Sequence, residues 1–593
     1  MESTNGRTRM RRLARLLPVL VIAIGGVVAG CGSSSSGSSS SSTPKSGGTV
    51  TILDANGSVD SLDPGYWYYE TDYTELGQTT QRWLYSWKDN STSPTPDLAT
   101  AMPAVSNGGK TLTIHIRPGV HYSPPLQNKT VTSSDIKYAL ERCFLANVGS
   151  DNYVSSYYND IVGAPAGHVT TLPNITGLQT PNPLTLVIKT TVPVGVLTNA
   201  NALGLPCTVP VPEYYAAKFD KGAASTYGMH QVFTGPYMIK GAGTGTVPTT
   251  SYQPGKLLVL VRNPSWQASS DPVRHAYFNQ IIIKGGNDPS VASQQIINGS
   301  DMMSGDYAAP PTPILKQLIT QDKGQYFVTP SDGNRYITLN DTIPPLNNVN
   351  VRRAISAVIN KVALRTTRGG PTLGTIATHF IPPGMPGFAQ AGGDAGPGYD
   401  FDSNPNGNLA LAESYMKKAG YKTGKYTGAP LLMIGDDTPP ANNTALAIES
   451  ELETLGFKFT FREVPHATMY SKFCEVTAAK VAICPNTAWG KDFYDSQSMI
   501  DPVFNGAALG PQTTNMAQVN NPTINAQIDA AVKIVNPTAR AAAWGKIDDE
   551  ITDQAYVVTW LWDNQINFES KDVHGAIWDF NSGDWDLTNS YLK

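Results

Sequence analysis

The sequence predicts an α/β protein with more than one domain. Its 593 residues are 40% hydrophobic and 15% charged, a globular composition with enough length for two or three domains. In the second half, short apolar runs alternate with stretches of helical periodicity, which is typical of βαβ units and a mainly parallel sheet. A basic and apolar N-terminus followed by a Ser/Gly-rich stretch further indicates an exported chain.

Residues 1–30 are expected to be a signal peptide. Several arginines precede the apolar run 16–28, which is shorter than the ~20 residues that a membrane-spanning helix needs. The small residues Ala29 and Gly30 then precede Cys31. This order resembles a bacterial lipobox, in which the cysteine thiol is alkylated with lipid. The alternative is an ordinary signal peptide followed by a chance cysteine.

Residues 31–48 are expected to be the lipidated Cys31 and a flexible tether. The stretch after the cysteine is nearly all Ser and Gly, which cannot bury a core, and its r.m.s. reach is roughly 20–25 Å. Two acyl chains on one cysteine suffice for stable anchoring. We therefore expect a protein that is lipid-anchored at the extracytoplasmic face of a bacterial cell membrane, in the periplasmic space or at the cell surface.

The net charge argues against a nucleic-acid partner. The whole chain carries −4, and because arginines dominate the charges of its first thirty residues, the remainder is more acidic still. Nucleic acids are bound by basic surfaces, so we expect no nucleic acid among the partners.

The globular part is expected to begin with a strand at 49–53 and a turn at 62–65. An unusually aromatic run follows, Tyr66-Trp67-Tyr68-Tyr69. Because aromatic side chains line many ligand clefts, Tyr66 and Trp67 are candidate ligand-binding residues. The alternative is that this run is a buried strand or the start of a helix.

Two further elements are predicted before residue 150. Leu112, Ile114 and Ile116 alternate with other residues after a Gly-Gly turn, which indicates a half-buried strand. A helix opens at 132–135, and its apolar residues recur at helical spacing along one face: Ile136, Ala139, Leu140, Cys143 and Phe144.

These elements carry a family resemblance. Residues 96–99, 109–120 and 131–142 resemble, in order, the motifs P-x-L-A, D-G-K-T-x-T-F-x-L-R-x-G-V and V-T-A-x-D-V-x-x-S-x-x-R. These motifs are the signature of the bacterial extracellular solute-binding proteins of family 5, the oligopeptide-, dipeptide- and nickel-binding group. The chain departs from the family pattern at the surface turn 123–128.

The resemblance extends over roughly residues 47–580, and the order and spacing of its motifs make it specific. The further matches are 175–178, 184–188, 211–214, 233–237, 262–264 and 336–355. The family implies a two-lobed periplasmic-binding-protein fold, type II and cluster C-like, with an extra subdomain in the first lobe and a two-strand hinge.

The implied domain boundaries are lobe I at 49–334 with a subdomain at about 90–220, lobe II at 335–554, and a return to lobe I at 555–593. Lobe II also shows its own α/β pattern: helices are predicted at 351–359, 409–419 and 444–455, and strands at 430–434, 457–461 and 480–484. The long apolar strand 555–568 returns to lobe I in the resembled family. The two interlobe crossings, near 335–340 and 555–564, are therefore expected to form the hinge.

Four cysteines remain beyond Cys31: Cys143, Cys207, Cys474 and Cys484. An even number outside the cytoplasm favours disulfides. Local pairing gives Cys143–Cys207 and Cys474–Cys484, although four cysteines allow three connectivities. A zinc site is the rival interpretation, but the sequence has no CxxC pair to support it.

The sequence contains no catalytic motif of the G-x-S-x-G, H-E-x-x-H or Walker type. His115 and His121 lack a third ligand nearby, so we expect no metal site, and no cofactor. The acidic run 548–550 lies in a helical stretch and is expected to be a solvated face. Asp436 and Asp437 follow a strand and either face the cleft or serve a loop.

The segment after strand 480–484 is the strongest candidate site, because α/β sheets place ligands at the carboxyl ends of their strands. It resembles the family segment G-W-x-A-D-Y-x-D-P: Trp489 and Asp492 match, whereas Lys491 replaces the usual alanine. In peptide binders of this family, the matching aspartate pairs with the α-amino group of the ligand and the tryptophan packs on the ligand. The alternative is a core Trp489 and an Asp492 that caps a helix.

Two asparagines complete the candidate ligand-binding residues. Asn486 lies within this segment, and Asn340 lies at the first interlobe crossing.

We therefore expect a monomeric solute-binding lipoprotein, and not an enzyme, that captures a small ligand, first of all a peptide, and delivers it to the membrane subunits of an ABC-type importer. Ligand alternatives in the same transport role are an oligosaccharide, an opine-like conjugate or a nickel chelate. The other classes are an extracytoplasmic enzyme and a non-transport sensor or scaffold that would use the aromatic run 66–69 as a contact surface.

Overall fold

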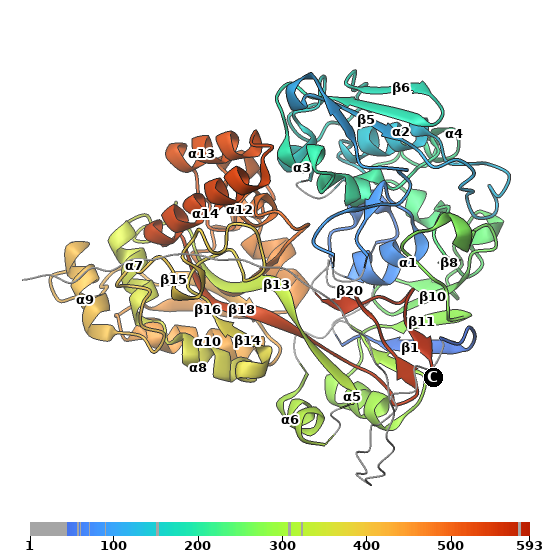
Figure 1. Ribbon diagram of the computed structural model, residues 1–593. Helices are drawn as coiled ribbons and strands as arrows, with labels where there is room; N and C mark the ends of the chain where they lie inside the picture. The colour runs from blue at the N-terminus through green and yellow to red at the C-terminus, as the bar shows by residue number, and fades with distance from the viewer. Residues whose placement is uncertain are drawn as a thin grey trace, which may run out of the picture. The chain divides into compact units, whose positions relative to one another are not determined.

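The computed structural model in Figure 1 describes residues 44–55, 59, 61–69, 71–88, 91–149, 153–305, 310–321, 324–578 and 583–593. The expected signal peptide, Cys31 and the tether up to residue 43 lie outside these residues. Within the described ranges, no helix combines the length and the apolar character that crossing a membrane requires.

The first sheet is mixed and begins with the predicted first strand, β1 (Thr49–Leu53). The strand order is β12-β1-β11-β10-β8, and β9 pairs with β10. β1 runs parallel to β11 and β12, while β10 is antiparallel to β11. The other strands are β8 (Tyr237–Ile239), β9 (Tyr252–Gln253), β10 (Leu257–Arg262), β11 (Gln280–Lys284) and β12 (Met302–Ser304).

A second, four-stranded antiparallel sheet has the order β4-β5-β7-β6. Its predicted strand β5 (Thr111–His115) buries Leu112 and Ile114 on one face. The neighbours are β4 (Ala104–Ser106), β6 (Leu178–Asn182) and β7 (Thr185–Lys189). The helix α2 (Ser133–Cys143) packs near this sheet, and a capping box of Thr132 and Asp135 explains why it starts there. We call the part of the chain that holds these two sheets lobe I.

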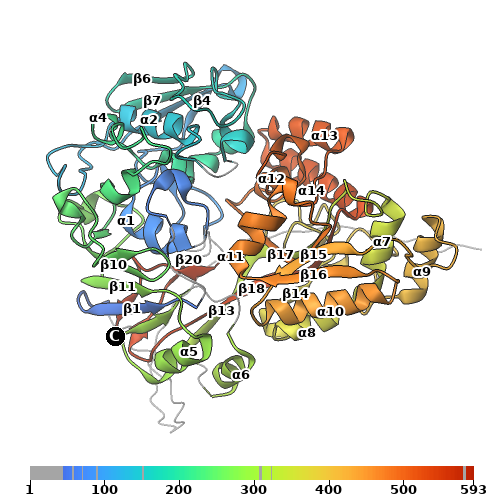
Figure 2. The same cartoon turned by 180° about the vertical axis from the view of Figure 1, so that it is seen from behind.

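The third sheet has the order β14-β18-β13-β17-β15-β16 and forms what we call lobe II (Figure 2). β15 is parallel to β16 and β17, whereas β13, β14 and β18 pair antiparallel with their neighbours. The bounds are β13 (Tyr326–Leu339), β14 (Gly374–Ile376), β15 (Leu431–Asp436), β16 (Phe459–Val464), β17 (Ile483–Gly490) and β18 (Val557–Phe568). The strands predicted at 430–434, 457–461 and 480–484 correspond to β15, β16 and β17.

β13 and β18 connect the hydrophobic cores of the two lobes. They pair antiparallel from Tyr326↔Phe568 to Thr338↔Val557, with a register shift between Pro330 and Asn334. Phe568 packs in a cluster of lobe I, whereas the other end of the pair contributes to a core of lobe II. These are the two chain segments that the sequence predicts as the hinge.

Helices cover the sheets of both lobes. Those of lobe I are α1 (Gln78–Thr80), α3 (Gly195–Thr198), α4 (Glu213–Ala216), α5 (Pro289–Asn298) and α6 (Thr312–Thr320). Those of lobe II are α7 (Val349–Val358), α8 (Lys361–Arg368), α9 (Leu409–Lys418), α10 (Ala441–Glu453), α11 (His466–Thr468), α12 (Gln497–Phe504), α13 (Pro522–Val532) and α14 (Pro537–Gln554). Among the described residues, π-helical turns form η2 (Asp72–Gly77), η4 (Val154–Tyr158) and η12 (Met469–Cys474). The remaining strands are the two-residue pairs β2 (Tyr85–Ser86) with β3 (Thr95–Pro96), β19 (Val573–His574) with β22 (Tyr591–Leu592), and β20 (Ile577–Trp578) with β21 (Asp584–Trp585).

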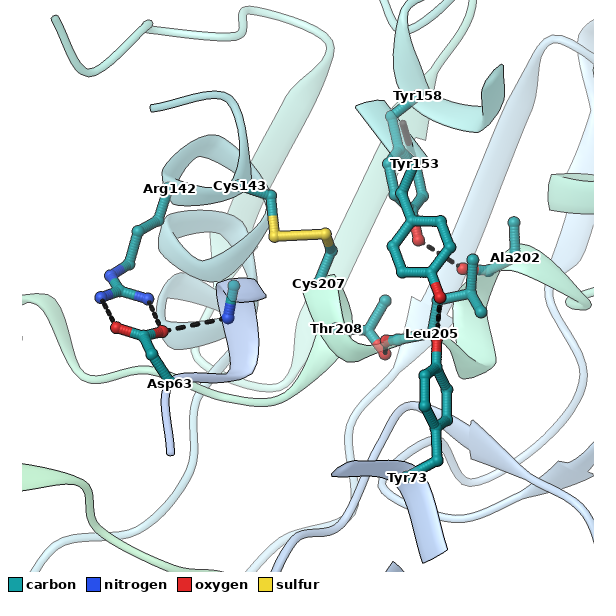
Figure 3. The surroundings of a disulfide bond; sticks show 11 residues. Asp63, Tyr73, Arg142, Cys143, Tyr153, Tyr158, Ala202, Leu205, Cys207 and Thr208 are labelled. Carbon is teal, nitrogen blue, oxygen red and sulfur yellow. Dashed lines mark hydrogen bonds and ion pairs between the residues drawn. A yellow bond between two sulfur atoms is a disulfide. The ribbon is translucent and has the colours of Figure 1, made fainter. Parts of the chain in front are cut away.

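The structure contains the two disulfides of the local pairing scheme. Cys143 at the end of α2 is bonded to Cys207, 64 residues away (Figure 3). Cys474 at the end of η12 is bonded to Cys484 on β17, 10 residues away. The second bridge ties η12 to the strand that precedes the candidate site.

The expectation that the acidic run of α14 is solvated is wrong for Asp548. Its carboxylate is fully buried, accepts the N–H groups of Phe380 and Ile381 at 3.0 and 2.8 Å, and lies 2.8 Å from Nδ1 of His379. These partners come from a loop about 170 residues earlier, so a pattern of neighbouring residues could not reveal them.

A buried ion-pair network fixes the turn that leads into the aromatic run. Figure 3 shows the Arg142 guanidinium donating twice to the Asp63 carboxylate, at 2.6 Å from each terminal nitrogen. Nε of Arg142 also donates to Asp220 at 2.7 Å. Asp63 in turn accepts the N–H of Gly65 at 3.0 Å and caps the 3-10 turn that ends at Tyr66. The network therefore sets where the aromatic run begins.

We predict that Arg142→Ala lowers the free energy of unfolding by about 3–5 kcal/mol, because it leaves two buried carboxylates without their cation. Arg353→Ala is the matched control: Arg353 pairs with Asp553 at a site where both side chains are partly exposed, so its loss is expected to cost about 0–1 kcal/mol. Urea denaturation of both variants measures the difference. Equal losses would contradict the role given to the buried network.

Candidate ligand-binding site

Asp492 lies on the loop after β17 and contacts lobe I. Its Oδ2 accepts the hydroxyl of Tyr157 at 2.6 Å, and Tyr153 also donates a hydrogen bond to the carboxylate. Tyr157 lies in η4, 335 residues before Asp492, and Tyr153 is the residue that caps the start of η4. The next residue, Phe493, is fully buried in the lobe I core, with its ring 5.0 Å from that of Tyr157. The loop therefore joins the two lobes.

Aromatic rings from three segments gather near this carboxylate. Tyr68 lies 6.4 Å from Trp489 and 5.5 Å from Tyr153, measured between ring centroids, and Tyr153 stacks on Tyr157 at 6.0 Å. Trp489 is 7% exposed and donates from Nε1 to the carbonyl of Ser498 at 2.8 Å. Trp489 is thus mostly a core residue of lobe II that also borders the aromatic group.

No cation pairs with the Asp492 carboxylate in the part of the chain that the structure describes. Among the residues that the structure describes, none lies within ion-pair distance of it, and Nζ of Lys491 instead lies 4.9 Å from the ring centre of Tyr494. Burial raises the pKa of Asp492 to about 7, although the hydrogen bonds from Tyr157 and Tyr153 lower it. A carboxylate whose charge is so disfavoured would be stabilised by a cationic ligand.

Further hydrogen bonds fix the loop on both sides. Arg540 donates from Nε and Nη2 to the two oxygens of Asp495 at 2.6 and 3.0 Å. Gln497 donates from Nε2 to the carbonyl of Ser156 at 3.1 Å and to Asp501 at 2.9 Å. The bond to Ser156 is a second contact between the loop and η4. Asp492 does not cap a helix, because the residue that precedes α12 is Ser496.

Among the described residues, no strand pairs with one edge of β17 over most of its length. β17 pairs with β13 from Ile483 to Gly490, but with β15 only at Ile483. On the open side, the N–H of Ala488 donates to the hydroxyl of Tyr470 at 3.1 Å. Asn486 is 3% exposed, and within the described ranges its Oδ1 has no hydrogen-bond partner. The segment before Asp492 therefore offers backbone and side-chain groups for a ligand.

The other predicted site residues lie in different surroundings. Trp67 is fully buried and donates from Nε1 to the carbonyl of Ser61, while Tyr66 is half-buried, and burial and Asp63 raise the pKa of its phenol. Asn340 donates to the carbonyl of Val481 at 2.9 Å and accepts from Thr342, so its side chain is engaged within lobe II. From the aromatic run, Tyr68 is the residue that meets Trp489.

Four residues near the site were not among the predicted ligand-binding residues: Tyr68, Tyr153, Tyr157 and Gln497. The stretch Tyr153-Val154-Ser155-Ser156-Tyr157-Tyr158 holds three tyrosines in six residues, and this composition could have drawn attention to it. Its nearness to Asp492 could not have been read from the sequence, because Tyr157 and Asp492 are 335 residues apart.

We predict that Asp492→Asn stabilises the ligand-free protein more at pH 8 than at pH 5. Since the folded-state pKa is raised above that of an exposed aspartate, the folded protein binds the proton more tightly, and the wild type loses stability as the pH rises from about 4 through 7. Asparagine mimics the protonated form, so the stabilisation should grow across this window to roughly 1–3 kcal/mol, less than the full shift because the carboxylate is partly exposed.

Thermal unfolding between pH 5 and pH 8 measures this effect. Asp437→Asn, at an exposed position of the same lobe, is the matched control for removing one negative charge. A difference between Asp492→Asn and wild type that does not change with pH would contradict the prediction.

Comparison with known proteins places the chain in a family. The family model described as "Bacterial extracellular solute-binding proteins, family 5 Middle" matches residues 93–510. A curated relative, the "Probable deoxycholate-binding periplasmic protein YgiS" of Escherichia coli, is 21% identical over 460 residues, which cover 77% of each chain.

Two solved structures share the fold. The "Clavulanic acid biosynthesis oligopeptide binding protein 2" superposes with a TM-score of 0.77 at 24% identity, covering 92% of this chain and 96% of the other. The DppA binding protein of Helicobacter pylori, in complex with the peptide STSA, gives 0.75 at 17% identity, covering 92% and 98%. The predicted fold class, a two-lobed type II periplasmic-binding fold, is thereby confirmed. With the family model matched over most of its length, this chain belongs to family 5 of the bacterial extracellular solute-binding proteins.

Proposed function

We propose that this protein captures a short peptide with a free α-amino group and delivers it to an ABC-type importer. The observation that carries the proposal is the Asp492 carboxylate: it lies at the junction of the lobes, has no cation among the described residues and is surrounded by aromatic rings.

The charge of Asp492 favours a cationic ligand group. Keeping an unpaired carboxylate in partly dehydrated surroundings costs free energy, and a cation that meets it recovers that cost. A peptide α-ammonium is such a cation, and the rings of Tyr68 and Trp489 nearby add cation–π attraction. One relative is named as a deoxycholate-binding protein, but deoxycholate is an anion and the Asp492 carboxylate would repel it.

The open edge of β17 favours a peptide over other amines. An extended peptide can add to a free strand edge through main-chain hydrogen bonds, and the edge leads directly to Asp492. Two similar structures support the same ligand class. The DppA binding protein of Helicobacter pylori holds a peptide, and the other protein is named an "oligopeptide binding protein".

The contacts of η4 with the loop support a closing movement. Tyr157 bonds to Asp492, and the carbonyl of Ser156 accepts from Gln497, so lobe I holds lobe II at the site itself. β13 and β18, which connect the two cores, are the elements about which the lobes would open to admit a ligand.

We further propose that a lipid anchor holds the protein at the membrane. After cleavage of residues 1–30, a diacylated Cys31 and the tether up to residue 48 would hold a monomeric binding protein at the extracytoplasmic face of the membrane, next to the importer.

We predict that wild type binds a peptide with a free amine about ten- to a hundredfold more tightly than the same peptide N-acetylated, because a charged hydrogen bond is worth roughly 1.5–3 kcal/mol. Asp492→Asn should lose this preference, and Asp437→Asn should keep it. Calorimetry with alanine peptides of two to five residues and with Ser-Thr-Ser-Ala measures both forms.

Two results would overturn the proposal. One is equal affinity of wild type for the free and the N-acetylated form. The other is a lack of binding by every peptide of the panel, which would direct attention to oligosaccharides or chelates.

For the anchor, we predict that Cys31→Ala moves the protein from the membrane fraction to the soluble extracytoplasmic fraction of the producing cell, since the acyl chains are then missing. Fractionation and immunoblotting of wild type and variant measure the distribution. Ser33→Ala, which leaves the thiol in place, is the control, and a Cys31→Ala protein that stays with the membrane would contradict the lipid anchor.

A further inference from the structure

A second contact between the lobes lies outside the loop of Asp492. Figure 1 shows α3 (Gly195–Thr198) on the side of lobe I that faces α12 to α14 of lobe II. Val532, at the end of α13, packs against the lobe I core that holds Val194. A Cβ atom placed on Gly109 of lobe I would stand 3.5 Å from Cγ2 of Val535. The turn between α13 and α14 therefore meets lobe I through a face that contains glycines.

At Gly195, the backbone of lobe I lies directly against lobe II. A Cβ atom added to Gly195 would stand 2.4 Å from Nη1 of Arg540 and 2.6 Å from the carbonyl oxygen of Ile534. The three nearest atoms all belong to Arg540 or Ile534, and therefore to lobe II. Because non-bonded heavy atoms attract best near 3.5–4.0 Å and repel strongly when much closer, a side chain at position 195 does not fit while the lobes are in contact.

Arg540 has little freedom to move aside. Its guanidinium is buried and binds both oxygens of Asp495, as described above, and its Nη2 also donates to Oε1 of Gln497 at 2.5 Å. From Nη1 it donates at 3.0, 3.2 and 3.3 Å to three backbone carbonyls, those of Ala531, Val532 and Ile534. A shift of the guanidinium would break several charged hydrogen bonds in a buried place, which costs more than separating the lobes by a small amount.

Lobe I itself does not require glycine at position 195. The φ angle of Gly195 lies outside the left-handed range, so an alanine can adopt the same backbone conformation. Alanine also favours a helix more than glycine does, and Gly195 is the first residue of α3. The contact with Arg540 is therefore the feature of the structure that excludes a side chain here.

We propose that Gly195 is a positioning residue for ligand capture: when the lobes close, its backbone packs on Arg540, and a side chain at this position holds the lobes apart. Arg540 also binds Asp495 and Gln497, so this contact lies one residue away from the hydrogen bond between Gln497 and the carbonyl of Ser156. The inference rests on the closing movement of the proposed function and names a contact that this movement requires.

Gly195→Ala tests the inference on ligand binding. By calorimetry, it should bind the free-amine peptides about ten- to a hundredfold more weakly than wild type, because overpacking penalises only the closed form, and Gly195→Val should bind more weakly still. The free and the N-acetylated peptide should weaken by the same factor, since Asp492 is unchanged. In stopped-flow measurements the loss should appear as faster dissociation with little change in association.

Gly167→Ala is the matched control, because Gly167 also lies in lobe I with an ordinary φ angle and a Cβ atom there meets nothing within 4 Å. It should bind as wild type does. A thermal unfolding scan of each variant without ligand checks that the lobes remain folded.

A distance measurement tests the closed form without any ligand. Spin labels on Gln179→Cys and Lys417→Cys, exposed positions of lobe I and lobe II, report the interlobe distance by double electron–electron resonance. Without peptide, wild type should show a short-distance population that Gly195→Ala lacks and Gly167→Ala keeps.

Three outcomes separate the two proposals. Gly195→Ala that binds like wild type would overturn the role of Gly195. Identical distance distributions of wild type and Gly195→Ala would overturn it too, even if binding weakens, since the loss would then come from within lobe I. A wild type that binds no peptide, or shows no preference for the free amine, would overturn the proposed function, and the ligand-free distances would still decide the role of Gly195.

Discussion

The pairing of β13 with β18 is the interaction on which the geometry of the site depends. One end of the pair contributes to a core of lobe I and the other to a core of lobe II, and the register shift between Pro330 and Asn334 separates the two ends. Because β13 also pairs with β17 on its other side, the same strand positions the segment that carries Trp489. A change in the pairing would therefore move the loop of Asp492 relative to the tyrosines of η4. The short loop between β17 and α12 adds little freedom, since Arg540 and Gln497 hold it from both sides.

Asp492 differs from several other buried acids of this protein, which pair with arginines. Asp63 has Arg142, Asp97 has Arg82 and Arg274, and Asp495 has Arg540. Among the described residues, the partners of Asp492 are the hydroxyls of Tyr157 and Tyr153, and burial raises its pKa to about 7 although these hydrogen bonds lower it. Burial also raises the pKa of Glu569 to about 7 and that of Asp501 to about 6, so what distinguishes Asp492 is its position at the contact between the two lobes.

Much of the fold could be predicted from the sequence, because strands and helices are specified by local patterns. The alternation at Leu112 and Ile114 and the capping box of Thr132 and Asp135 act within a few residues, and the structure contains β5 and α2 where they indicate. The site was predicted only in part. Asp492 and Trp489 could be predicted because they come after a strand end and match a motif. Tyr157 could not be predicted, because its contact with Asp492 spans 335 residues. The aromatic run was noticed, yet which of its side chains faces the site depends on backbone orientation, and the structure turns Trp67 into the core and Tyr68 toward Trp489.

The proposed charged anchor, Asp492, belongs to lobe II, and the strand β17 that leads to it is positioned by its pairing with β13. Selection for a cationic ligand group would then occur on lobe II alone, before closure. Lobe I contributes Tyr157 and Ser156, which contact the loop of Asp492 and not the strands. Closure therefore adds hydrogen bonds around the carboxylate at the same moment as it removes water from it. That step is unfavourable for a bare carboxylate and favourable for one that is paired, and this difference is what allows a ligand to shift the equilibrium towards the closed form.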